Sequence, residues 1–285
     1  MPAGVLAAVA AELARLTPRD RQLLGLLAEH RTLTTEQIAQ ATFGTIGRAR
    51  NRLNTLHTRD VLDRFRHYVR PGSQSWRWTL GPVGAAIVAA AANAPLPRPA
   101  AVRTATNRLA LSPTLRHLLG VNGFFTELLG HARTHDGATL TRWCSERQAT
   151  RECANAAHPD AGGVWTEHGR AVTFWLEHDT GTEPLARVAA KLAGYATLSG
   201  TRVGHPVLIW LPTAVRESNL SAHLTRTGIP AGVTVATAAG DHADAHGGPP
   251  GPVWQVHGHA GRLRLAELGV PAPYRGDDGG AAWDG

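Results

Sequence analysis

Two short stretches, His158-Pro159-Asp160 and Phe174-Trp175-Leu176-Glu177-His178-Asp179, decide the fold of the second half of the chain. A Pro-Asp pair precedes an apolar run that ends in acidic residues. Two neighbouring strands can hold such carboxylates side by side, where they could bind a divalent cation. Lys191, the only lysine among 29 Lys and Arg residues, follows. The pattern predicts a metal-dependent nuclease-type core with Asp160, Glu177 and Asp179 as metal ligands.

The segments around these stretches predict an α/β (α+β) domain with the order αβββαβ at its centre, because helical and strand patterns follow one another without strict alternation. Pairs such as Ser112-Pro113 are typical of helix starts. The predicted helices are 112–133, 184–198 and 216–227, and the predicted strands are 140–150, 162–165, 171–177, 207–211 and 232–236.

This order resembles the restriction-endonuclease-like nucleases with the PD-(D/E)xK motif. The resemblance implies that Asp160 and Glu177 hold Mg²⁺ or Mn²⁺, if the protein is catalytic. Asp179 stands where the family has its lysine, so Lys191 would replace that lysine from the following helix. Lys191 and Tyr195 also match the spacing of the Gln-x-x-x-Tyr motif in RecB-like nucleases, and Glu127 corresponds to an acid of the family's first helix.

Metal chemistry explains why such a site needs carboxylates and a lysine. Mg²⁺ needs only one or two carboxylates besides water and phosphate, and it lowers the pKa of a bound water. A lysine nearby stabilises charge in the transition state. In the alternative interpretation, Asp160 is a turn residue, whereas Glu177 and Asp179 only end a strand.

The first third of the chain is strongly basic. Up to Thr104 it has 14 arginines against six acidic residues, whereas the remainder is nearly neutral. This asymmetry indicates a polyanionic partner, and double-stranded DNA is the one that we expect.

The same third resembles a winged helix-turn-helix. Helices are predicted from Thr17-Pro18, from Thr34 and over 45–58, the last with Ile46 on its buried side, and two strands (61–69 and 75–80) form a hairpin. The third helix would enter the major groove and the hairpin would contact phosphates or the minor groove. The predicted DNA-binding residues are Arg48, Arg50, Asn51 and Arg52 of the helix and Arg64, Arg66, Arg70 and Arg77 of the hairpin.

Four parts follow from these patterns. We expect a winged-helix domain over 1–93, an extended Pro-rich linker over 94–111, a nuclease-like domain over 112–268 and a disordered tail over 269–285. A helix that begins at Gly81-Pro82 would pack on the first domain or pair two copies in a homodimer.

Several classes of protein are excluded. No apolar run is long enough for a membrane helix, and the first residues lack the basic start of a signal peptide. Cys144 and Cys153 have no metal-site spacing, which fits a reducing cytoplasm. No P-loop pattern occurs. The run Asp241–His246 contains metal-binding residue types, but its Gly- and Pro-rich surroundings favour a solvated loop.

Three short motifs, Trp143-Cys144-Ser145-Glu146, Pro159-Asp160-Ala161 and Leu176 to Glu183, together with the winged helix and the linker, resemble the replication-relaxation family over about Leu16 to Ala236. Its members are associated with plasmids and mobile elements of Gram-positive bacteria. The resemblance implies a role in DNA processing or replication, with plasmid replication or transfer proteins as possible partners.

Three functions stay open at this point. The chain is a metal-dependent endonuclease, a non-catalytic replication or transcription factor with a degenerate nuclease fold, or a protein-docking adaptor. The positive charge of the first third favours DNA binding over docking.

Overall fold

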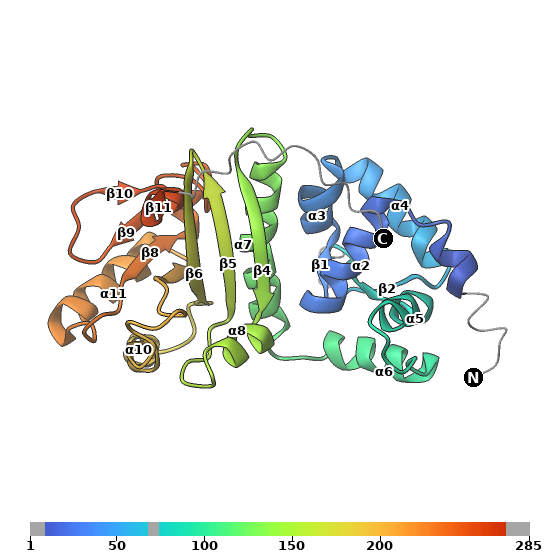
Figure 1. The fold of residues 1–285 in the computed structure, drawn as a ribbon, viewed down its shortest axis with the longest axis horizontal. Coiled ribbons are helices and arrows are strands. Elements are labelled where there is room, and N and C mark those ends of the chain that lie inside the picture. Colours follow the sequence, from blue (N-terminus) through green and yellow to red (C-terminus); the bar gives the residue numbers. More distant parts are fainter. Residues whose placement is uncertain (1–8, 68–73, 272–285) are drawn as a thin grey trace.

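The computed structural model describes residues 9–67 and 74–271 and confirms the mixed α/β class. Figure 1 shows a mainly helical N-terminal unit on one side and a larger unit built on a sheet on the other, and long helix α7 (Leu115–Ala132) lies between them. The hairpin tip with Arg70 and most of the predicted tail lie outside the described residues.

The N-terminal unit includes three helical segments (α2, α3 with its π-helical turn, and α4) and a small antiparallel sheet. Both predicted caps are present: Thr17 caps α2 (Pro18–His30) and Thr34 caps α3 (Thr35–Ile38), each in a reciprocal capping box. α3 continues as a π-helical turn (Ala39–Phe43), and α4 (Ile46–Thr58) follows. The sheet has the order β1 (Leu33–Thr34), β3 (Arg77–Leu80), β2 (Leu62–Phe65).

Two details of this unit differ from the prediction. Ile46 is 38% exposed at the start of α4, and Ala49, Leu53 and Leu56 alone form the buried side of that helix. The described strands of the hairpin are also shorter than the β-type runs, because the chain leaves the sheet after Phe65 and rejoins it at Arg77.

The predicted extended linker is wrong for most of its length. α5 (Pro82–Ala91) is followed by a short connection and then by α6 (Pro99–Ala110). Pro99 occupies the first turn of α6, where a proline costs no hydrogen bond and has a suitable φ. The proline content that indicated a linker therefore includes a helix start. α6 buries Thr106 and Leu109 and contacts α5 and β2.

The second unit is built on an eight-stranded mixed sheet. Seven strands have the order β10-β9-β8-β7-β6-β5-β4, and β11 (Val270–Pro271) pairs with β6. β6, β7 and β8 are parallel, and every other pair is antiparallel. The strands are β4 (Thr139–Ser145), β5 (Ala161–Glu167), β6 (Arg170–His178), β7 (Val207–Leu211), β8 (Val235–Ala239), β9 (Trp254–Val256) and β10 (Arg262–Leu263).

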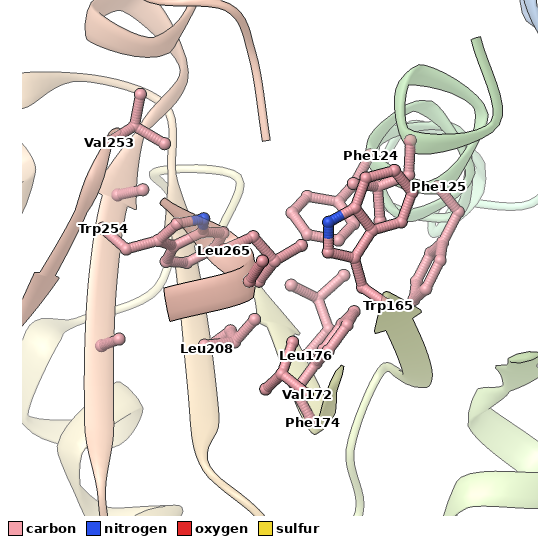
Figure 2. Close-up of a cluster of buried hydrophobic side chains, with 14 of the residues drawn as sticks. Phe124, Phe125, Trp165, Val172, Phe174, Leu176, Leu208, Val253, Trp254 and Leu265 are labelled. Atoms are coloured by element: carbon pink, nitrogen blue, oxygen red, sulfur yellow. The ribbon is translucent and has the colours of Figure 1, made fainter. Parts of the chain in front are cut away.

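Two cores cover the two faces of this sheet. On one face, α7 contributes Phe124 and Phe125 to a cluster that includes Leu176 and Trp254 (Figure 2). On the other face, Trp175 and Ile209 pack with side chains from helices. These helices are α9 (Leu185–Ala190), α10 (Leu192–Ala196) and α11 (Ala214–Thr227). Because neighbouring residues of a strand face opposite sides, β6 serves both cores.

Two predicted elements of this unit need correction. The predicted strand 140–150 ends at Ser145, and α8 (Glu146–Glu152) follows. The predicted helix 184–198 is divided into α9 and α10 at Lys191. Within the described residues, no helix is both long and apolar enough to cross a bilayer.

The two units meet along a polar seam at α7. Asn122, which is 1% exposed, donates from Nδ2 to the carbonyl oxygens of His30 (3.1 Å) and Thr32 (2.7 Å). Gln37 Nε2 donates to the Leu119 carbonyl at 2.8 Å. The ring of His30 stacks on Trp143 of β4 with centroids 3.5 Å apart. These contacts join α2, α3 and the residues between them directly to α7, which covers one face of the sheet.

Candidate functional site

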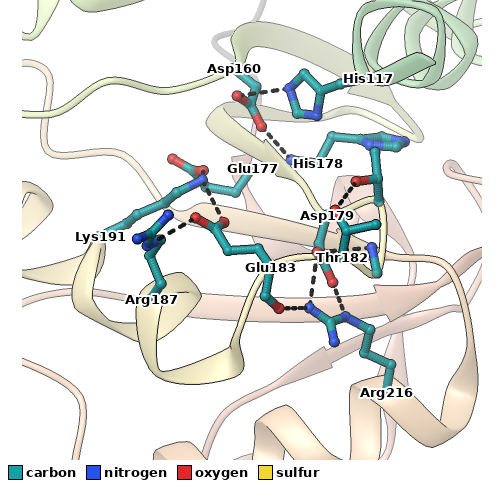
Figure 3. A network of polar contacts seen from close by, with 12 residues as sticks. His117, Asp160, Glu177, His178, Asp179, Thr182, Glu183, Arg187, Lys191 and Arg216 are labelled. Atoms are coloured by element: carbon teal, nitrogen blue, oxygen red, sulfur yellow. Dashed lines mark hydrogen bonds and ion pairs between the residues drawn. The ribbon is translucent and has the colours of Figure 1, made fainter. Parts of the chain in front are cut away.

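Strand pairing brings Asp160 and Glu177 to the same end of the sheet. Ala161 of β5 pairs with Leu176 of β6, and the Asp160 N–H donates to the Leu176 carbonyl at 3.0 Å. Asp160 therefore lies directly before one strand, and Glu177 lies near the end of its neighbour. Figure 3 shows both acids with the polar side chains around them.

Asp160 is held by two donors. The His178 N–H donates to Oδ2 at 2.7 Å, and His117 Nε2 of α7 lies 3.0 Å from Oδ1. Burial opposes ionisation of Asp160, but the hydrogen bond and charge of His117 outweigh it and lower the pKa of this carboxyl. The same hydrogen bond raises the pKa of His117. This contact fixes the orientation of Asp160.

Glu177 is 3% exposed and accepts two hydrogen bonds. Lys191 Nζ donates to Oε2 at 2.9 Å, and the Tyr195 hydroxyl donates to Oε1 at 2.5 Å. Burial, followed by the charge of Asp160, raises the pKa of Glu177 to about 7, although Lys191 and Tyr195 act in the opposite direction. Lys191 lies at the break between α9 and α10 and Tyr195 one turn later, so both reach the same carboxylate.

Asp179 is paired with Arg216 of α11. Its carboxylate accepts from Nε and, at 3.1 Å, from Nη2 of Arg216 on α11, and from the Gly181 N–H at 3.0 Å. Arg216 also donates to the Glu183 carbonyl. Asp179 is 7% exposed and neutralised by this guanidinium. It therefore fixes the loop after β6 to α11.

A divalent cation fits two of the three predicted ligands. Asp160 and Glu177 supply hard oxygens, and the repulsion between them raises the pKa of Glu177, which is a cost that a bound cation would remove. Asp179 is held at both oxygens by Arg216. Glu177 is likewise paired with Lys191, so a cation at Glu177 would share that carboxylate with the lysine. Within the described residues, no three His, Cys, Asp or Glu side chains gather as a metal-binding group. Water and phosphate would have to complete the coordination of an ion held by two carboxylates.

The structure does not bring Glu127 to this site. Glu127 lies in α7 ten residues beyond His117, and it lines a separate cavity with Asp244 and Gly248. Burial, with the charge of Asp244, raises the pKa of Glu127 to about 7. In the Asp241–His246 segment, Asp241 accepts from the Ala214 N–H at 2.8 Å and His242 stacks on His246.

The predicted DNA-binding residues of α4 divide into two groups. Arg48, Arg50 and Asn51 are exposed. Arg52 instead forms a two-point ion pair with buried Asp20, in which Nε donates to Oδ1 at 2.9 Å and Nη2 to Oδ2 at 2.5 Å. Asp20 also belongs to the cap of α2, so Arg52 ties α4 to α2 and is a poor candidate for contact with DNA.

The hairpin arginines gather over aromatic rings. The guanidinium carbons of Arg64 and Arg66 each lie 4.2 Å from the centroid of Trp76, and Arg64 also donates to Asn54 of α4 at 2.8 Å. Arg77 donates to Gln74. A groove of about 340 Å³ lies between α4 and the hairpin. Its lining residues include Arg50, Asn54, Arg64, Arg66, Trp76 and Trp78.

Three contributors to the acidic cluster escaped the sequence interpretation. His117 lies in an otherwise apolar helix, Arg216 lies outside every motif, and Glu183, the last residue of the Leu176–Glu183 motif, had no predicted role in the site. Only the fold brings them to Asp160, Asp179 and Lys191. The ring of His178 is covered by α7, where a Cβ on Gly120 would meet it. Burial lowers the pKa of His178 to about 4, so this ring is neutral.

The class of the protein follows from comparison with known families. Residues 24–208 match the family model described as replication-relaxation. The chain therefore belongs to the replication-relaxation family, as its motifs suggested, and this membership indicates a role in the replication of plasmids or other mobile elements. No curated protein and no solved structure gave a significant match.

Proposed function

We propose that this chain is a replication protein that binds double-stranded DNA through α4 and the β2–β3 hairpin, which together act as a winged helix. The observation that carries the proposal is the groove between these elements, whose cations are Arg50, Arg64 and Arg66. Arginine presents several donors in a planar fork, which suits phosphates and guanine edges alike. The exposed side chains of Arg48 and Asn51 extend this surface along α4.

Removal of the two exposed arginines of α4 tests the proposal. For a random 40-base-pair duplex we expect roughly tenfold weaker binding for Arg48→Ala and for Arg50→Ala, because each loses a hydrogen bond to a charged group. Fluorescence anisotropy at several salt concentrations measures the effect. Arg202→Ala, in the exposed segment before β7, removes the same charge and should bind like the parent. Equal weakening by all three variants, or no binding by the parent, would contradict this assignment.

A second function, metal-dependent phosphodiester cleavage, is favoured by the cluster at the end of the sheet. Asp160 and Glu177 would hold Mg²⁺ or Mn²⁺, which would polarise the phosphate and acidify a bound water. His117 orients Asp160 and helps to lower the pKa of this carboxyl. Lys191, 2.9 Å from Glu177, is placed to stabilise negative charge on the phosphate. Tyr195 holds the other oxygen of Glu177.

Incubation with supercoiled plasmid tests this second function. With Mg²⁺ or Mn²⁺ we expect nicked or linear product, which disappears with chelator and falls at least about a hundredfold in Glu177→Ala. Asp136→Ala replaces an exposed acid and should retain activity. If no metal supports cleavage while the protein still shifts DNA in a gel, the chain is a non-catalytic DNA-binding factor with a degenerate nuclease fold. Thermal unfolding of each variant shows that it is folded.

A further inference from the structure

A long part of the chain has no negative charge. Residues 64–126 contain eight arginines and neither aspartate nor glutamate. Three of these arginines, Arg64, Arg66 and Arg77, belong to the hairpin. Another three, Arg103, Arg108 and Arg116, lie on α6 and at the start of α7. The positive charge of the first third thus continues beyond the winged-helix surface into a second region.

Helix α6 presents these charges on its surface. Its buried residues, Thr106 and Leu109, face the rest of the N-terminal unit, whereas Arg103, Asn107 and Arg108 are exposed. Arg103 lies 3.2 Å from Asp60, but their side chains are 53% and 55% exposed, so the pair adds little stability and leaves the guanidinium accessible. Within the described residues, Arg108 and Arg116 have no ion-pair partner.

The end of α6 is fixed in place by the hairpin. His67, which follows β2, has its Nε2 2.9 Å from the carbonyl oxygen of Ala110, the last residue of α6. Four residues, Leu111 to Thr114, then connect α6 to α7. Arg108 and Arg116 therefore lie on either side of a short, anchored connection.

The same connection leads to the acidic cluster. Arg116 is followed by His117, the partner of Asp160. His117 and Asp160 line a cavity of about 420 Å³ whose wall also includes two cations, Arg31 and Arg147, and two acids, Glu29 and Glu146. Arg147 lies 3.5 Å from Glu29. In Figure 1, α6, the start of α7, α8 and α10 lie along the same lower edge of the molecule. Arg116, the last of the three arginines, therefore directly precedes a residue that lines this cavity.

We propose that Arg103, Arg108 and Arg116 form a second DNA-contacting surface, which holds phosphates of a duplex and directs its backbone to the cavity beside His117 and Asp160. The inference rests on the proposed DNA-binding function, because it extends the contact beyond α4 and the hairpin. A rigid helix with spaced arginines and no acid suits a regularly charged polymer, whose phosphates recur along the backbone. Base recognition is left to α4.

The salt dependence of binding tests this surface. Each phosphate contact contributes about 0.9 to the slope of log affinity against log salt concentration. For Arg108→Ala/Arg116→Ala we therefore expect a slope about 2 shallower than that of the parent, measured on the random 40-base-pair duplex. Arg202→Ala/Arg226→Ala removes the same charge from the segment before β7 and from α11 and should keep the parental slope.

A photo-crosslinking residue at Asn107, which is exposed between the arginines, gives an independent readout. We expect it to capture the duplex, and the same residue at Asn219 of α11 to capture none. If Arg108→Ala/Arg116→Ala keeps the parental slope and Asn107 captures no DNA, while Arg48→Ala and Arg50→Ala still weaken binding, the second surface is refuted and the winged helix remains. If the parent does not bind DNA, the proposed function itself fails.

Discussion

Replacement of Asn122 by alanine is expected to lower the free energy of unfolding by about 3 kcal/mol. The Nδ2 group of Asn122 donates to two carbonyl oxygens, of His30 and Thr32, at the seam between the two units. The alanine variant would remove this donor from the Thr32 carbonyl and would open a small cavity, whereas the His30 carbonyl would keep its hydrogen bond from the Thr32 N–H at 2.8 Å. Each unpaired buried group costs about 1–3 kcal/mol, and the cavity adds to that cost. Urea unfolding followed by circular dichroism measures the loss.

Asn219→Ala is the matched control for this prediction. Asn219 lies exposed on α11, so the same change there should alter the free energy of unfolding by less than about 0.5 kcal/mol. Hydrogen exchange shows whether the loss of stability comes from the seam between the two units or only from the surroundings of residue 122. We expect faster exchange in α2 and α7 together in Asn122→Ala, because the seam joins them. A loss in Asn122→Ala no greater than that in Asn219→Ala would show that the units do not depend on this contact.

Local signals predicted much of the fold because their causes are local. Thr17 with Asp20, and Thr34 with Gln37, satisfy the first N–H groups of their own helices, so these helix starts could be predicted from the residues alone. The short apolar run 207–211 became the buried central strand β7. Asp160 precedes one strand-like segment, and Glu177 ends the next one. Because neighbouring strands align such ends, the sequence could predict that the two acids lie close together.

The site features that the sequence did not predict depend on contacts between residues far apart in the chain. Nothing near His117 in the sequence indicates Asp160, which is 43 positions away and reaches it only when α7 covers the sheet. Asp179 seemed a third metal ligand until α11 brought Arg216 to it. Glu127 has a suitable side chain on the predicted helix, but it lies nearly three turns beyond His117 and meets Asp244. Periodicity predicts which face of a helix is buried, but it does not predict which residue from elsewhere in the chain packs against each turn.

Helix α6 shows a different limit. Pro95, Pro97 and Pro99 have the composition of a linker, but a proline in the first turn of a helix is a start signal. The residues after Pro99 distinguish the two interpretations, because the run from Ala100 to Ala110 contains mostly good or neutral helix formers. α6 buries Thr106 and Leu109 and contacts α5 and β2, and this packing favours the helix.

Glu177→Gln is expected to become more stable relative to the parent protein as pH rises from 5 to 8. The pKa of Glu177 is raised to about 7 by burial and by Asp160, above the value of about 4.5 for a free glutamate. In the parent, the folded state therefore keeps a proton that the unfolded state has lost, and stability falls as pH rises through this range. Glutamine does not titrate, so the difference in unfolding free energy should increase by at most about 3 kcal/mol.

The difference between the two proteins isolates this carboxyl. Burial lowers the pKa of His30 and His178 to about 4, so these groups destabilise the folded state only at acid pH, and they do so in both proteins. Glutamine keeps the size of Glu177 and an oxygen that accepts from Tyr195 or Lys191. Asp136→Asn, at an exposed acid, controls for a general loss of negative charge and should give a flat difference. If the Glu177→Gln difference stayed flat from pH 5 to 8, Glu177 would be ionised in the folded parent throughout this range, and the repulsion from Asp160 that favours a cation between the two acids would be too weak to matter.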